Sequence, residues 1–120
     1  SGALILEYTA HAAAAEVRSL AAPATAQWVS LSGGVESHAS LAPTAARRAR
    51  EALDCLRLAV AAELVAATRA LRLSGREPGG ESRALWEAAR AHLDPELADR
   101  PLHGDVETAR VLLVDWPAVA

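Results

Sequence analysis

One stretch of this chain, residues 43–73, constrains its fold more than any other segment. After Pro43 it contains no glycine and no further proline, and a proline in the first turn of a helix is well tolerated. Its apolar residues lie on several sides of a helix and include one stripe formed by Leu53, Leu56, Val60, Leu64, Ala67 and Leu71. We therefore predict one helix about 45 Å long, which is longer than a small domain is wide. A helix that is apolar nearly all round is typical of the middle of a large helical body.

The remaining segments predict further helices and one long loop, so the expected fold class is all-α, without a sheet. Residues 1–21 predict a helix that Pro23 ends, with apolar residues at Leu4, Ile5, Tyr8, Ala12, Ala15 and Leu20. Residues 22–42 contain proline, glycine, serine and threonine without a helical period, and they predict a loop. Residues 74–120 predict short peripheral helices over 81–93 and 105–114, the second of them capped by Asp105.

The composition predicts a thin core. The chain is 52% hydrophobic but only 3% aromatic, and it contains neither phenylalanine nor methionine. Alanine favours helices, but each alanine buries little apolar area. We therefore expect other polypeptide to cover much of the apolar surface, and the isolated chain to associate with itself. The alternative is a compact alanine-rich bundle that folds alone.

Charge and cysteine content narrow the possible partners and the compartment. The net charge of −3 argues against nucleic acid or an anionic membrane as the main partner. The basic residues Arg47, Arg48 and Arg50 are interpreted as a solvated or ion-paired helix start. A single cysteine, Cys55, forms no internal disulfide and favours a reducing, cytoplasmic setting. Neither a membrane span nor a metal site is predicted, because no apolar run is long enough and the four histidines lack ligand spacing.

The loop ahead of the long helix holds the best candidates for chemistry. Glu36 is the candidate catalytic residue, because a carboxylate near an amine can hold an ammonium group or relay its proton. The residues expected to bind substrate or support the loop are Ser32, Gly33, Gly34, Val35 and His38. The plainer alternatives are a solvated loop glutamate at Glu36 and a structural histidine at His38, bonded to backbone.

A series of motifs in this chain resembles the histidine and aromatic amino-acid ammonia-lyases. In chain order they are Ser1-Gly2, Tyr8-Thr9-Ala10, Glu16, Arg18, Pro23, Ser32, Glu36, His38, Ser40, Thr44-Ala45-Ala46-Arg47, Asp99-Arg100-Pro101-Leu102 and Asp105-Val106. No single motif is decisive, but their order and spacing extend over nearly the whole chain.

The resemblance implies a carbon–nitrogen lyase that eliminates ammonia from histidine or an aromatic amino acid. It also implies a homotetramer built on a bundle of long helices, with this chain as the C-terminal helical segment. The family uses a methylidene-imidazolone made from its own Ala-Ser-Gly tripeptide, which lies far N-terminal to the matching region. This sequence contains no Ala-Ser-Gly, so the cofactor is expected from the missing N-terminal part, and the fragment alone is expected to be inactive.

Two positions depart from the histidine-specific branch of the family. Gly34-Val35 stands where that branch has Asn-Gln, and Glu7 stands where the family often has glutamine. A glutamine side chain can hydrogen-bond a cofactor or substrate, whereas a valine side chain cannot. Two alternatives to a lyase therefore stay open: an aromatic amino-acid 2,3-aminomutase, and a non-catalytic helical assembly module.

Overall fold

The computed structural model describes residues 2–36 and 40–116 of the 120-residue chain. Over these residues four α-helices form the fold: α1 (Gly2–Leu20), α2 (Ala42–Ser74), α3 (Ser82–His92) and α4 (His103–Asp115). In the same ranges, two short 3₁₀ turns, η1 (Ala24–Gln27) and η2 (Ser32–Gly34), lie between α1 and α2. Extended pairing in the described part is limited to one isolated bridge, between Leu31 and Glu36, so the all-α prediction is confirmed. None of the described helices combines the length and the apolar character that crossing a membrane requires.

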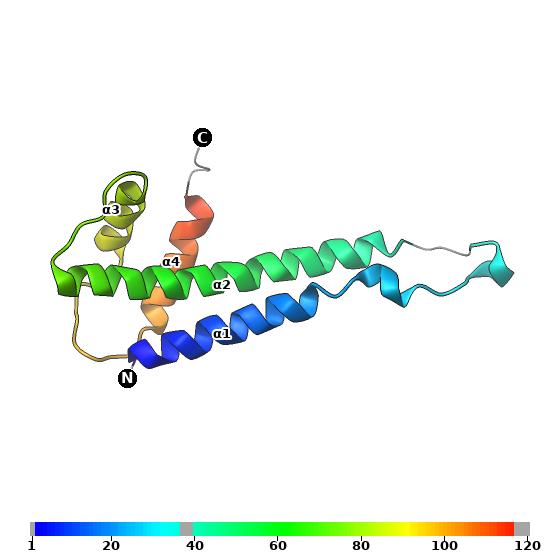
Figure 1. Ribbon diagram of the computed structural model, residues 1–120, viewed down its shortest axis with the longest axis horizontal. Helices are drawn as coiled ribbons and strands as arrows, with labels where there is room; N and C mark the ends of the chain where they lie inside the picture. The colour runs from blue at the N-terminus through cyan, green and yellow to red at the C-terminus, as the bar shows by residue number, and fades with distance from the viewer. Residues whose placement is uncertain (1, 37–39, 117–120) are drawn as a thin grey trace.

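Helices α1 and α2 form a long antiparallel hairpin, and α3 and α4 pack near the C-terminal half of α2 (Figure 1). The molecule measures 67 × 35 × 19 Å, and its radius of gyration is 19.5 Å. A compact chain of this length has a radius of gyration of about 14 Å. The chain is therefore elongated, because the hairpin of α1 and α2 and the loop that joins them extend well beyond the region where α3 and α4 pack (Figure 1).

The longest predicted helix matches the observed one closely. Helix α2 begins at Ala42 and ends at Ser74, within one residue of the predicted 43–73, and Gly75 ends it in the left-handed conformation at φ +65°. Such a C-terminal glycine is favoured because it lacks a Cβ. Helix α3 turns one face inward, with Trp86, Ala89 and the following Leu93 buried and Leu85 partly buried.

All four helices contribute to one small core, to which the segments next to α3 and α4 also add residues. Its buried members are Leu6, Ala61, Ala62, Val65, Ala89, Leu93, Leu102, Val106 and Ala109. Alanine at the contact points lets helices approach closely, but it removes little apolar area from water. The core is accordingly thin, as the composition predicted.

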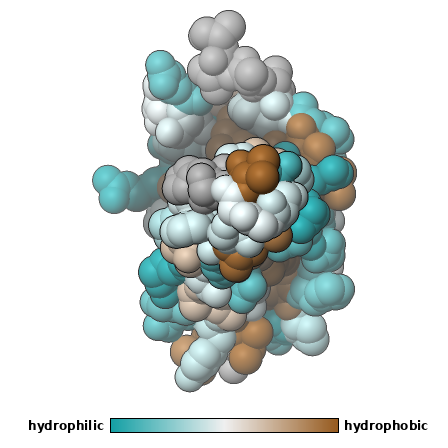
Figure 2. All heavy atoms as spheres, turned by 90° about the vertical axis from the view of Figure 1, so that its right-hand side faces the viewer, coloured by the Kyte–Doolittle hydropathy of each residue, from teal (hydrophilic) through white to brown (hydrophobic). Residues whose placement is uncertain are grey.

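The apolar stripe of α2 is not the face that this chain buries. Leu53 and Leu56 are about half exposed, at 53% and 49%, whereas the buried face centres on Ala61, Ala62 and Val65. The small residues allow a close approach of the helices at the core, where Leu64 of the stripe is partly buried, whereas Leu53 and Leu56 stay at the surface. Figure 2, which looks at the loop end of the molecule, shows brown apolar atoms exposed among teal polar ones. It stays a prediction that other polypeptide covers Leu53 and Leu56.

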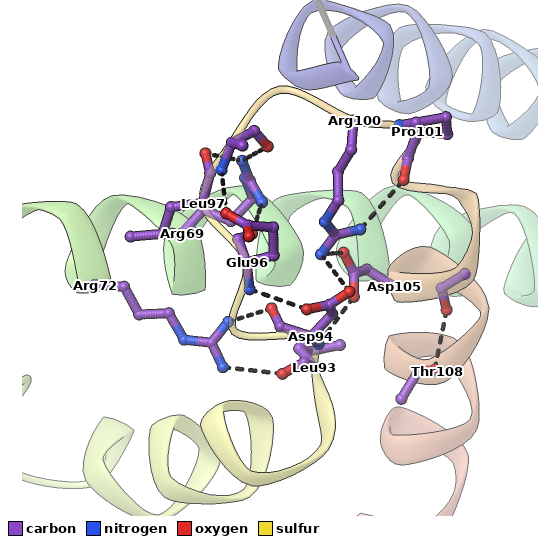
Figure 3. Close-up of polar contacts among 12 residues, drawn as sticks. Arg69, Arg72, Leu93, Asp94, Glu96, Leu97, Arg100, Pro101, Asp105 and Thr108 are labelled. Carbon is purple, nitrogen blue, oxygen red and sulfur yellow. Dashed lines mark hydrogen bonds and ion pairs between the residues drawn. The ribbon is translucent and has the colours of Figure 1, made fainter.

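Two arginines of α2 fasten the segment that follows α3. Arg72 donates hydrogen bonds to the carbonyl oxygens of Asp94, Arg90 and Leu93 at 2.6, 2.9 and 3.0 Å. One turn earlier, Arg69 donates to the carbonyl oxygens of residues 96, 97 and 98 at 2.8 to 3.2 Å. Figure 3 shows both side chains reaching from α2 toward this segment. The planar guanidinium, with its five donors, suits such multiple contacts.

The predicted cap of the last helix is wrong. Helix α4 begins at His103, after Leu102, and no side chain caps its N-terminus. The carboxylate of Asp105 instead accepts hydrogen bonds from the guanidinium of Arg100 at 2.7 Å and from the backbone N–H of Asp94 at 3.1 Å (Figure 3). Because the helix begins two residues before Asp105, this carboxylate lies inside the first turn, where it bonds to the preceding segment.

Candidate active-site loop

The loop predicted at 22–42 joins α1 to α2 and projects beyond the ends of both helices (Figure 1). It is more ordered than its composition predicted, because it holds η1, η2 and the bridge between Leu31 and Glu36. The root of the loop packs against α2 through η1, where Ala24 is buried. The helical hairpin thus presents the loop tip at one extreme of the molecule.

The tip is a six-residue turn closed by backbone hydrogen bonds. The N–H of Leu31 donates to the carbonyl oxygen of Glu36 at 3.0 Å, and the N–H of Glu36 donates back to that of Leu31 at 3.3 Å. The enclosed residues Ser32, Gly33 and Gly34 have φ angles of +54°, +65° and +93°. Glycine adopts these left-handed angles freely, whereas serine there costs about 1 kcal/mol or more. Gly33 and Gly34 therefore suit the left-handed backbone of this turn.

The structure brings five of the six predicted site residues together in this turn. Glu36 and its neighbours from Ser32 to Val35 are all exposed, and the Val35 side chain is 85% exposed. Within the described part of the chain, no cation forms an ion pair with the Glu36 carboxylate. The sixth residue, His38, lies outside the described residues. The turn therefore presents the groups of its described residues outward.

A large groove lies far along the hairpin from this loop. It has a volume of about 760 Å³ between α1 and α4, and its walls include Leu6, Leu58, Leu102 and Val106. None of the predicted site residues lines it. The groove and the predicted site residues therefore lie in different parts of this chain. Among the described residues, no cluster of three histidine, cysteine, aspartate or glutamate side chains is placed to bind a metal.

One residue connected to the loop was not singled out from the sequence. The guanidinium of Arg48, on α2, donates a hydrogen bond to the carbonyl oxygen of Ala22 at 3.0 Å, which crosses from α2 to the root of the loop. Arg47 instead donates within its own turn, to the hydroxyl of Thr44 at 3.4 Å. Nothing in the spacing of the basic cluster distinguishes Arg48, because its partner lies 26 residues earlier.

The fold and the loop together define a class: an elongated helical scaffold that presents a carboxylate-bearing turn at one end. The sequence model of the aromatic amino acid lyase family matches residues 1–91. The chain belongs to that family, and the resemblance seen in its motifs is confirmed.

Similar proteins include several named histidine ammonia-lyase. That of Streptomyces coelicolor is 41% identical over 109 residues, which cover 82% of this chain and 21% of that protein. That of Symbiobacterium thermophilum is 36% identical over 121 residues, covering all of this chain and 24% of that protein. The chain thus spans about a quarter of the length of the curated relatives it matches. No solved structure matches it significantly.

Proposed function

We propose that this chain is the C-terminal part of an ammonia-lyase that eliminates ammonia from histidine or an aromatic amino acid. The observation that supports it best is the outward turn at Leu31–Glu36, in a chain whose relatives are named histidine ammonia-lyase. Backbone hydrogen bonds fix the turn that carries the Glu36 carboxylate, and its exposed position allows other polypeptide to enclose it.

Glu36 is the proposed catalytic residue. Loss of ammonia from an amino acid requires a group that holds the ammonium or carries its proton, and a carboxylate does either. Water surrounds this carboxylate in the chain alone, and enclosure by other polypeptide would strengthen its attraction for an ammonium group. Ser32, Gly33 and Gly34 support the turn, and Val35 and His38 are proposed to face the substrate or support the loop.

The family's methylidene-imidazolone would come from upstream polypeptide, because this chain has no Ala-Ser-Gly. The residues present fit such a group, since the exposed Glu36 carboxylate has no ion-pair partner in the described ranges. When bound, the group supplies an electrophile for the substrate amine. This chain would contribute only the positioned carboxylate and the turn that carries it.

The proposed partners are the rest of the same lyase chain and sister subunits in a cytoplasmic homotetramer. The exposed apolar residues of α1 and α2 support this. On α1, Ile5 and Tyr8 are 60% and 66% exposed, and on α2, Leu53 and Leu56 are about half exposed. Burial of apolar side chains of this size normally stabilises a folded protein or an assembly.

Two other functions remain as alternatives. An aminomutase would return the amine to the neighbouring carbon with the same carboxylate. A non-catalytic helical module is supported by Val35, which offers no amide where the histidine-specific branch has one.

The test uses the full-length protein that contains this chain. Histidine, phenylalanine and tyrosine are each supplied, and the rise in ultraviolet absorbance of an α,β-unsaturated acid is followed. Lyase activity with one of them is expected, and Glu36→Gln should lower kcat by about a hundredfold or more while the oligomer survives. Glu51→Gln, at an exposed position of α2, is the matched control and should match the wild type. A β-amino acid product would instead identify an aminomutase, and no turnover of any substrate would favour the helical module.

A further inference from the structure

The contact between Arg48 and Ala22 joins two segments that the loop separates. Arg48 lies in the second turn of α2, and Ala22 lies two residues beyond the end of α1. The Arg48 side chain is half-buried in a small groove whose walls include Pro23, Ala24 and Ala49. Its guanidinium is thus held by packing as well as by the 3.0 Å hydrogen bond to the Ala22 carbonyl oxygen.

This hydrogen bond joins the outgoing end of the loop, which follows α1, to α2. Helix α2 begins at Ala42, where the returning end of the loop finishes. The outgoing end is continuous with α1, which packs along α2, and beyond the end of α1 the packing of η1 and the Arg48 contact hold it against α2. The tip is closed internally between Leu31 and Glu36. A shift at the root would therefore displace Glu36 together with the whole turn.

We propose that Arg48 is a positioning residue for Glu36, acting through the carbonyl oxygen of Ala22 and the root of the loop. This inference rests on the proposed catalytic role of Glu36. The other arginines of the cluster do not share the role, because Arg47 bonds within its own turn and Arg50 is exposed. A displacement of about 1 Å in a catalytic group is enough to slow a reaction substantially.

The first experiment compares three variants in the full-length enzyme. Arg48→Gln removes the guanidinium that spans the gap and should lower kcat about tenfold. Arg48→Lys keeps a cationic donor and should retain kcat within about twofold of the wild type, because one donor suffices for one carbonyl. Arg50→Gln is the control and should leave kcat and the melting temperature unchanged. Equal activity of Arg48→Gln and Arg50→Gln, or an equal loss in Arg48→Lys and Arg48→Gln, would overturn the proposal.

A double-mutant cycle separates positioning from a general structural role. If Arg48 acts through Glu36, Arg48→Gln should cost nothing further in kcat once Glu36→Gln is present. Two losses that multiply would mean that Arg48 acts elsewhere, and the proposal would be wrong.

The same variants distinguish failure of the catalytic role of Glu36 from failure of the positioning role of Arg48. Activity unchanged by Glu36→Gln removes the catalytic role and the positioning role together, whereas activity lowered by Glu36→Gln but not by Arg48→Gln removes the positioning role alone.

Discussion

The guanidinium of Arg100 lies 2.7 Å from the carboxylate of Asp105, in an ion pair whose aspartate side chain is only 6% exposed. The Asp105 carboxylate also accepts a hydrogen bond from the backbone N–H of Asp94, so this one side chain joins the segment after α3 to the first turn of α4. The Nε of Arg100 is buried without a hydrogen-bond partner among the described residues. The guanidinium therefore depends on its terminal nitrogens, and the pair is the main polar link between these segments.

Asp105→Asn should lower the free energy of unfolding by about 2 kcal/mol, because it leaves the largely buried guanidinium of Arg100 with only the half-exposed Asp94 carboxylate, at 3.4 Å, as an ionic partner. The side-chain oxygen is retained, so packing and the contact to the backbone N–H are preserved. Denaturant unfolding of the chain measures the change. Asp54→Asn is the matched control, since Asp54 pairs with Arg57 at 2.9 Å with both side chains about half exposed. Exposed pairs of this kind contribute less than about 1 kcal/mol, so equal losses in the two variants would contradict the importance of burial.

Gly2 opens α1 at a point of very close backbone approach. A Cβ at this position would collide with the carbonyl oxygen of Arg100, and the backbone N–H of Gly2 donates to Asp99 at 2.7 Å. Alanine favours a helix over glycine by about 1 kcal/mol, but the collision involves backbone that cannot rotate away. Gly2→Ala should therefore destabilise the chain by about 1–3 kcal/mol, measured as a lower melting temperature.

Gly104→Ala provides the comparison for Gly2→Ala. Gly104 lies in the first turn of α4, and a Cβ there would meet no atom within 4 Å. The same substitution should then stabilise the chain by about 0.5 kcal/mol, because only helix propensity and chain entropy remain. Two shifts of the same sign would show that the approach of Gly2 to Arg100 does not limit the fold.

The sequence predicted features that depend on neighbouring residues better than features that depend on distant ones. The bounds of α2 follow from Pro43, Gly75 and the absence of breakers between them, all of which are local. The buried face of α1 does not follow from its pattern. Apolar residues occur on several sides of this helix, and the structure buries Leu6 and Ala13 rather than Ile5 or Tyr8. Only the position of α2 selects that face.

In the candidate site, too, the sequence predicts the features that depend on neighbouring residues and misses the contacts between distant ones. Glycines in a polar loop predict a turn, and the left-handed angles at Gly33 and Gly34 agree with it. Other contacts join residues far apart in the chain. The hydrogen bonds from Arg48 to Ala22, and from Arg72 to the carbonyl oxygens of Arg90, Leu93 and Asp94, span 18 to 26 residues. A guanidinium can reach carbonyl oxygens from many positions, so residue type alone identifies neither contact. Long-range polar contacts require the packing of helices to be known first.

The isolated chain should self-associate through the exposed apolar residues of α2. Leu53 and Leu56 lie one turn apart and are about half exposed, and the alanine-rich core offers no room for them. Burying half of a leucine side chain contributes about 1 kcal/mol, so several such residues together favour association. Static light scattering over a concentration series should give a mass above that of the 12.5 kDa monomer. The double substitution Leu53→Gln and Leu56→Gln should shift the chain toward monomer, because glutamine keeps helix propensity without the apolar area. Ala66→Gln, exposed on α2 but off the stripe, should not. A wild-type chain that stays monomeric throughout would mean that these leucines need no covering polypeptide.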